Sequence, residues 1–296
     1  MNKTTYVCKV LTPMFIAGAN QKHPELRAAS IKGVMRYFFR AVMNYPNTEQ
    51  LFTEEGKLFG CVKGSDGQQS GLRIQVLVSS PNIGDEAMLP HRLSGNPMMQ
   101  QAIRKGTTFS VTLRSFSNSS VNHALYEALF ELTVLLGGFG RRSRRGFGSV
   151  MIERKNDANY LQEGTLLQQV FNLLQVLSPG LFHLDTASSK IVRMRRSMAH
   201  YPYIEEIQET TPKANVTELL RHYGQQAHNT RSTAPLGFKL TGSIEGGRYA
   251  SPVYCTAFTK TQGLVIKLHA MRYIQDNNVY QVHLDHQKTF IDNVLR

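Results

Sequence analysis

The feature that most constrains the fold is an alternation of strand-like and helix-like patterns along the first half of the chain. Four segments rich in alternating or β-branched apolar residues are predicted strands: residues 4–11, 72–79, 109–113 and 150–152. Two segments with apolar side chains at helical spacing are predicted helices: residues 30–42 and 123–136. In chain order this is strand, helix, strand, strand, helix, strand, which is the ferredoxin-like or RRM-like arrangement of an α+β protein.

The second half of the chain shows fewer regular patterns. Helical spacing is found in three segments: residues 161–177, 216–227 and 286–295. Two strand-like segments predict a hairpin: residues 253–258 and 264–271. The length of 296 residues predicts two domains, which we place at 1–155 and 156–296. A degenerate second ferredoxin-like domain is compatible with these patterns, although they do not require it.

Two stretches of the first half lack a clear period. Residues 46–70 are predicted to be irregular, with a glycine-rich turn. Residues 81–105 contain Pro81, Pro90 and Pro97 together with several Gly and Asn, and we expect a long loop there. Loops of this length are often functional.

The charge balance restricts the class of partner. The chain has 34 Lys and Arg against 21 Asp and Glu, a formal net charge of +13, which predicts a polyanionic partner such as nucleic acid.

We expect no contact with a membrane, because no apolar stretch is long enough to span one and no signal-peptide core follows Met1. Cys8, Cys61 and Cys255 are too far apart for a disulfide scaffold or a CxxC metal site. We therefore expect a cytoplasmic protein without a metal or cofactor.

The most specific motif is the glycine-rich and arginine-rich loop 137–148, which follows a predicted helix. Glycines let a backbone approach a ligand, arginines bind phosphates, and Phe139 and Phe147 could stack on bases. The predicted RNA-binding residues in this loop are Gly138, Phe139, Gly140, Arg141, Arg142, Arg144, Arg145, Gly146 and Gly148. The loop lacks the GKS or GKT of a phosphate-binding P-loop. The alternative interpretation is a helix end followed by a solvated basic turn.

A second basic motif begins the first predicted helix. Lys32, Arg36 and Arg40 recur every four residues, which predicts a basic stripe opposite the apolar face. Ser30 as N-cap, together with Arg27 and the free N–H groups of the helix start, predicts an anion site. The alternative is an ordinary solvated helix face. A third cluster at residues 193–196 is interpreted as solvated surface.

Candidate catalytic residues are few. His23 and Glu25 lie in the loop after the first strand, and a histidine there could act as a general base toward a ribose 2′-OH. The chain has no HExxH, GxSxG or paired-Asp motif. Cys8 lies on a predicted strand, where we expect it to be buried and inert.

These motifs, in this order, resemble the RAMP superfamily of CRISPR effector proteins. Within it, the opening segment is similar to the first subunit of the Cmr complexes of type III-B. Five blocks carry the resemblance: residues 11–19, 25–27, 30–36, 58–60 and 138–148.

The resemblance implies two ferredoxin-like domains, the second degenerate, and a non-catalytic RNA-binding subunit of an antiviral ribonucleoprotein. Such a subunit holds the 3′ part of a guide RNA and its duplex with target RNA, beside other subunits. The target-cutting subunit of the superfamily uses an Asp after its first strand, whereas residues 12–30 contain none here. Residues 81–105 would protrude toward the duplex or a neighbouring subunit. Two alternatives remain: a metal-independent endoribonuclease of the superfamily that uses His23, and an RNA-binding protein outside any defence system.

Overall fold

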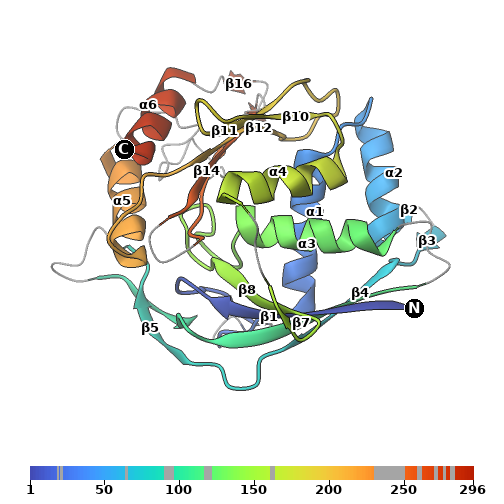
Figure 1. The fold of residues 1–296 in the computed structure, drawn as a ribbon, viewed down its shortest axis with the longest axis horizontal. Coiled ribbons are helices and arrows are strands. Elements are labelled where there is room, and N and C mark those ends of the chain that lie inside the picture. The colour runs from blue at the N-terminus through green and yellow to red at the C-terminus, as the bar shows by residue number, and fades with distance from the viewer. Residues whose placement is uncertain are drawn as a thin grey trace.

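The computed structural model describes most of the chain, namely residues 1–18, 20, 23–63, 66–89, 97–116, 122–160, 164–229, 251–258, 262–269, 273–275, 278–280 and 284–296. These residues form an α+β protein with two antiparallel five-stranded sheets (Figure 1). In this part of the chain no helix combines the length and the apolar character that crossing a bilayer requires.

The first sheet confirms the element order predicted for the first half. Its strands are β1 (Asn2–Val10), β4 (Leu72–Leu77), β7 (Thr108–Ser115), β8 (Val150–Lys155) and β9 (Ala158–Asn159). They lie in the order β4-β7-β1-β8-β9, and all neighbours are antiparallel. Helices α1 (Ala28–Val42) and α3 (His123–Leu136) separate the strands along the chain and lie over the same face of the sheet (Figure 1). The predicted helical face is the buried one, with Ile31, Met35 and Phe38 inside.

Two predictions of irregular structure in the first half are wrong. Residues 46–70 contain α2 (Thr48–Phe59), which Asn47 caps by accepting a hydrogen bond from the Gln50 N–H at 2.8 Å. They also contain the paired strands β2 (Cys61–Lys63) and β3 (Asp66–Gln68). The predicted loop at 81–105 contains a two-stranded antiparallel ribbon of β5 (Ile83–Ala87) and β6 (Met99–Ile103). Each strand has two adjacent polar residues at its centre, Asp85 and Glu86 in β5 and Gln100 and Gln101 in β6, so neither shows the apolar alternation by which a strand is predicted from sequence.

The second half adds three strands that the sequence patterns did not reveal. They are β10 (Phe182–Asp185), β11 (Lys190–Arg193) and β12 (Ile204–Glu209). The predicted hairpin strands are observed as β13 (Val253–Cys255) and β14 (Leu264–Leu268), which complete the order β10-β11-β12-β14-β13. The predicted helices are α4 (Leu166–Leu177), α5 (Val216–Asn229) and α6 (Leu284–Leu295), and β15 (Tyr273–Gln275) pairs with β16 (Asn278–Tyr280). The described elements of this half therefore run α-β-β-β-α-β-β-β-β-α, not β-α-β-β-α-β.

The hydrophobic core joins the two halves. Helix α3 packs on the first sheet, α4 packs on the second, and the two helices pack on each other, so the layers run sheet, helix, helix, sheet (Figure 1). One buried cluster contains Phe38 and Leu132 from the first half together with Leu174, Ile207 and Tyr254 from the second.

Candidate nucleic-acid interface

The loop after β1 lies against the glycine-rich loop. The Arg141 N–H donates to the Phe15 carbonyl at 2.7 Å, and the Gly148 N–H donates to the Pro13 carbonyl at 3.0 Å. The Thr12 hydroxyl donates to the carbonyl of Gly146 at 2.7 Å. These three hydrogen bonds hold residues 12–15 against the loop 137–148.

The other side of the same segment holds the start of α1. The Glu25 N–H donates to the Ile16 carbonyl at 3.3 Å, and the Gly18 N–H donates to the His23 carbonyl at 3.0 Å. Residues 13–18 therefore have the glycine-rich loop on one side and the approach to α1 on the other. The two basic motifs, far apart in sequence, meet at one segment, as expected from the predicted order of elements.

The start of α1 differs from the prediction at one residue. The N-cap is Arg27, which has extended backbone angles and makes no side-chain capping bond, and the helix begins at Ala28. Ser30 lies in the first turn, where its N–H donates to the Arg27 carbonyl at 3.0 Å. The exposed Arg27 side chain adds a full positive charge to the partial positive charge of the helix N-terminus.

The predicted basic stripe of α1 is not a free surface. Arg36 and Arg40 both form ion pairs with Glu55 of α2, the Arg36 Nε lying 2.9 Å from Oε1 of that carboxylate. Glu55 is only 4% exposed, and its hydrogen bond to Arg40 raises the pKa of that guanidinium. The Lys32 ammonium donates to the Ser70 hydroxyl at 2.7 Å. The prediction of an open stripe is wrong because α2, which the sequence patterns did not reveal, packs against it.

The phenylalanines of the glycine-rich loop belong to the core. Phe139 and Phe147 are 1% and 2% exposed, and the Phe147 ring lies 5.2 Å from the ring of Phe15. The prediction that these rings stack on bases is therefore wrong for this conformation. Burial of each apolar ring in the core lowers the free energy relative to leaving that ring exposed to water on a solvated loop.

The glycines of the loop allow the backbone to approach itself. Gly148 has φ +67°, and a Cβ there would lie 2.0 Å from the Phe139 carbonyl oxygen. A Cβ on Gly138 would lie 2.6 Å from the Phe147 carbonyl oxygen. Gly146 faces Leu220 and Tyr223 of α5 in the same way. The close approach made possible by these glycines is to the protein's own chain.

Two of the four loop arginines bind the second half of the chain. Arg145 is buried, donates to the Val253 carbonyl at 3.1 Å and lies 5.3 Å from the Phe290 ring centroid. Burial lowers the pKa of its guanidinium to about 10. Arg144 donates to the Ser251 carbonyl and lies 4.6 Å from the Tyr254 ring centroid. Both side chains join the loop to the second sheet.

The other two arginines face outward to different degrees. Arg141 and its neighbour Gly140 are exposed. Arg142 is half-buried, with its guanidinium 6.0 Å from the Phe147 ring centroid, and burial lowers its pKa. Among the loop arginines, Arg141 is therefore the best placed to bind an external phosphate.

The cluster at residues 193–196 divides in a similar way. Arg193 is buried and donates to the carbonyl of Met43 at 2.9 Å and of Val42 at 3.4 Å, so it satisfies carbonyl groups at the end of α1. The solvated-surface interpretation is therefore wrong for Arg193, and it is confirmed for Arg195 and Arg196, which are exposed. No local pattern marks Arg193, because the carbonyls that it binds lie 150 residues away.

The candidate catalytic residues form no assembled site in the described structure. His23 and Glu25 are both exposed. Within the described residues there is no group of three or more His, Cys, Asp and Glu side chains able to hold a metal ion. Cys8 is fully buried, which confirms its predicted place in the core, and burial raises the pKa of its thiol.

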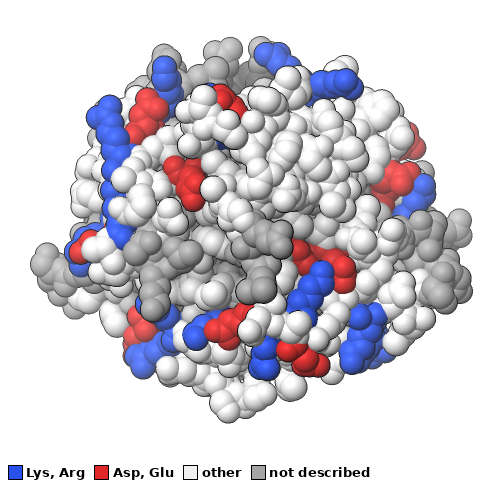
Figure 2. All heavy atoms as spheres, in the orientation of Figure 1, with Lys and Arg blue, Asp and Glu red and all other residues white. Residues whose placement is uncertain are grey.

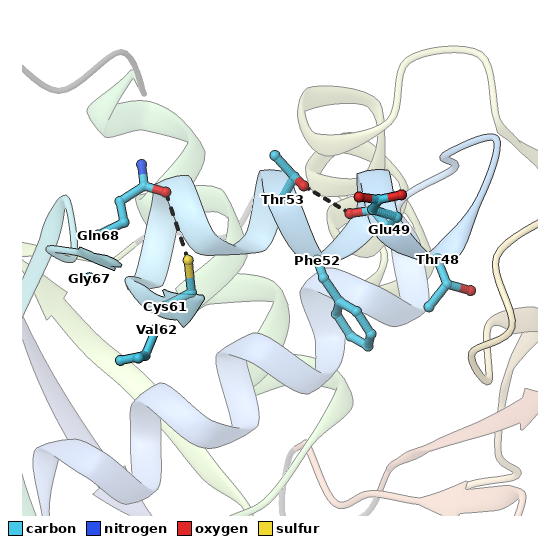
Figure 3. A pocket seen from close by; sticks show the side chains of 8 residues that line it. All are labelled: Thr48, Glu49, Phe52, Thr53, Cys61, Val62, Gly67 and Gln68. Atoms are coloured by element: carbon cyan, nitrogen blue, oxygen red, sulfur yellow. Dashed lines mark hydrogen bonds between the residues drawn. The ribbon is translucent and has the colours of Figure 1, made fainter. Parts of the chain in front are cut away.

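A hollow of about 670 Å³ lies between α2 and the paired strands β2 and β3 (Figure 3). Its lining residues are Thr48, Glu49, Phe52, Thr53, Cys61, Val62, Gly67 and Gln68. Glu49 is the charged residue among them, so the hollow has no positive charge with which to attract a phosphate. It does not extend the basic interface.

The positive charge does not gather into one patch on the face drawn in Figure 2. Basic and acidic side chains alternate around its rim. The excess of positive charge therefore matters through particular exposed side chains, not through one broad field on that face.

Comparison with known proteins identifies the family. The family model of the RAMP superfamily matches residues 7–151. The CRISPR system Cmr subunit Cmr1-2 of Pyrococcus furiosus is 29% identical over 184 residues, which cover 52% of this chain and 96% of that subunit. Cmr subunit Cmr1-1 of the same organism is 26% identical over 283 residues, covering 85% and 79%.

Solved structures share the fold. The crystal structure of apo Cmr1 from Pyrococcus furiosus has a TM-score of 0.56 at 20% identity, over 100% of this chain and 97% of that chain. A chain of the type III-B Cmr-beta complex bound to cognate target RNA has a TM-score of 0.59 at 11% identity, over 99% and 98%. The chain described here belongs to the RAMP superfamily and is a homologue of the Cmr1 subunit of type III-B CRISPR complexes.

Proposed function

We propose that this chain is a non-catalytic, RNA-binding subunit of a type III-B CRISPR effector complex. In this role it holds the 3′ part of the guide RNA and its duplex with target RNA through contacts to backbone phosphates. The observation that carries the proposal is the meeting of the two basic motifs on residues 13–18. That meeting leaves Arg27 and Arg141 exposed beside the N-terminus of α1.

Phosphate contacts suit a subunit that must accept guides of any sequence. Arginine binds phosphate oxygens with a fork of N–H donors, and a helix N-terminus favours an anion. Such contacts position an RNA strand but do not read its bases, which pair with the target instead. Arg27, Ser30, Gly140 and Arg141 are the residues we assign to these contacts.

The relatives support the assignment to a complex. The Pyrococcus furiosus proteins are named as Cmr subunits, and the Cmr-beta structure that shares the fold contains target RNA. We therefore infer that guide RNA, target RNA and other Cmr subunits are the partners of this chain.

We also infer that the first half is a ferredoxin-like domain. Its four long strands have the chain order and the sheet order β8-β1-β7-β4 typical of that fold, with both helices on one face. The second half is then a degenerate copy in which a three-stranded meander precedes α5. The boundary near residue 155 stays a prediction, although β9 extends the first sheet to Asn159.

Binding of RNA by a double variant tests the proposed surface. We expect Arg27→Ser with Arg141→Ser to weaken the binding of guide RNA about tenfold and to lower the salt slope by about 1.4, roughly 0.7 for each phosphate that is no longer bound. The control is Arg195→Ser with Arg196→Ser, which removes the same charge from another exposed site. Equal affinity of the double variant and the wild type would reject this surface.

The enzymatic alternative has one observation in its favour, since His23 is exposed next to the proposed RNA surface. Against it, no hydrogen bond to the His23 ring is found among the described residues, so nothing there orients the ring as a general base. We expect guide precursor RNA to stay intact when incubated with the protein in EDTA. Cleavage that His23→Ala abolishes would establish the enzyme instead.

A further inference from the structure

The open face of the first sheet carries a row of three basic side chains. Lys3 of β1 lies opposite Arg114 of β7, and Arg114 lies opposite Arg73 of β4. Neighbouring strands are about 5 Å apart, so the three backbones that carry these side chains lie within about 10 Å of one another.

Strand alternation places this row on the face away from the helices. Tyr6 and Cys8 of β1 are fully buried, and the Tyr6 ring lies 4.7 Å from the Phe130 ring of α3. Residues of opposite parity point to the other face, and Lys3 and Arg73 are exposed there.

The row has no acidic partner among the described residues. The Arg114 Nη1 donates to the amide oxygen of Gln75 at 2.8 Å, and none of the three forms an ion pair there. Lys9, at the far end of the same face, does have one, with its Nζ 3.1 Å from the carboxylate of Glu153. Like charges directly opposite each other destabilise a sheet. An anion bound across the row would remove that repulsion.

An exposed aromatic ring lies next to the row. Phe116 directly follows β7, two residues after Arg114, and is 41% exposed. The next row of the face is polar, with Thr5, Thr112 and Gln75. Positive charge beside an aromatic ring on an open sheet is the combination that binds single-stranded nucleic acid, in which phosphates meet the charges and an unpaired base stacks on the ring.

We propose that Lys3, Arg73, Arg114 and Phe116 form a second RNA-binding surface, which takes a single-stranded segment. This inference rests on the proposed role in RNA binding and extends it. The surface lies at the N-terminal end of β1, beside β4 (Figure 1). The Arg27 and Arg141 surface lies beyond the other end of β1, roughly 30 Å away along the strand. RNA bound at one surface thus leaves the other free for an unpaired extension.

Fluorescence anisotropy with the full chain tests this surface, using a labelled single-stranded polyuridine RNA and a duplex RNA of the same length. The test variant is Lys3→Thr, Arg73→Thr and Arg114→Thr, because threonine suits exposed strand positions. The matched control is Arg195→Thr, Arg196→Thr and Arg221→Thr, which removes three exposed charges elsewhere. A fourth protein, Phe116→Ser, tests the stacking.

We expect the row variant to bind single-stranded RNA about tenfold more weakly, with a salt slope lower by about two. We expect Phe116→Ser to lose about fivefold in affinity for single-stranded RNA and little for duplex. The melting temperature of the row variant should stay equal or rise, since repulsion is relieved.

Wild-type affinity of the row variant, with weak binding by the Arg27 and Arg141 variant, would overturn this inference and leave the proposed function standing. The reverse result would support this surface and reject the other. A row variant that binds RNA normally but fails to join the Cmr complex would show that the face binds a protein. A wild-type chain that binds no RNA would reject both proposals.

Discussion

At the scale of single residues, arginines of the loop 137–148 differ in whether they are exposed or buried. Arg141 is exposed, whereas Arg145, four residues on, is buried beneath α6 and binds backbone carbonyls. A buried guanidinium needs its hydrogen bonds satisfied, and the carbonyl groups of residues 144 and 253 accept them. Local sequence assigns the same charge to both residues, so it does not separate an exposed arginine from one that is buried in the core.

The glycines allow a matched stability test at this scale. We expect Gly148→Ala to destabilise the protein by at least about 3 kcal/mol, because its φ of +67° and its contact with the Phe139 carbonyl exclude a Cβ. Gly33→Ala, in α1, has nothing within 4 Å of the added Cβ and should stabilise by about 1 kcal/mol. Urea denaturation measures both. Equal effects of the two changes would contradict this account of the loop.

At the scale of elements, the contact of α1 with α2 decides whether the basic side chains of α1 are free or paired. Glu55 holds both Arg36 and Arg40, and Arg40 also lies over the rings of Phe52 and Tyr201. The apolar face of α1 was predictable from the helical spacing of its apolar residues, because that face packs on the sheet regardless of which elements cover the opposite face. Whether the basic face of α1 is exposed depends on α2, which packs against it. The α2 sequence is mostly polar, so its apolar spacing did not predict a helix there.

Removing one carboxylate tests the α1–α2 contact. We expect Glu55→Gln to cost roughly 3–5 kcal/mol of unfolding free energy, because it leaves two partly buried cations without their partner. Glu54→Gln, which breaks the more exposed pair with Lys57, should cost no more than about 1 kcal/mol. Thermal melts of both variants, followed by circular dichroism, provide the comparison. Similar melting temperatures would show that the buried pairs are not important to stability.

A second test at this scale concerns α5 and α6. Burial lowers the pKa of His222, whose Nε2 lies 3.1 Å from the Val294 carbonyl oxygen. The folded state therefore binds a proton less readily than the unfolded state, whose histidine titrates near 6.5, so stability should fall as the pH drops below that value. Urea midpoints across this range should fall more steeply for the wild type than for His222→Gln. The exposed His183→Gln is the control, and identical slopes in all three proteins would contradict the assignment.

At the scale of the whole molecule, the two halves share one core. Tyr254 of the second sheet packs on Phe38 of α1 at 5.9 Å between ring centroids. Arg193 from the second half satisfies carbonyls at the end of α1, and Arg144 and Arg145 from the first half bind carbonyls around β13. Unfolding one half alone would break these contacts, so its free-energy cost is high and we expect the halves to unfold together.

The cysteines report on this coupling. Cys8 lies in the first sheet and Cys255 in the second, and both are fully buried. In a Cys61→Ser background we expect both thiols to become reactive at the same urea concentration, in one transition that coincides with the loss of circular dichroism. Labelling identified by peptide mass at each urea concentration measures this. Exposure of one thiol well before the other would show that the halves unfold independently.

The sequence by itself determined the alternation of strands and helices in the first half, the apolar face of α1, the positive charge and the family motifs. These depend on local periodicity and composition, which the chain carries whatever its neighbours are. The tertiary structure alone decided which basic residues remain free. Burial, carbonyl partners and ion pairs come from residues up to about 150 positions away in sequence, and a charged side chain can bind an external anion only if no part of its own chain has already paired with it.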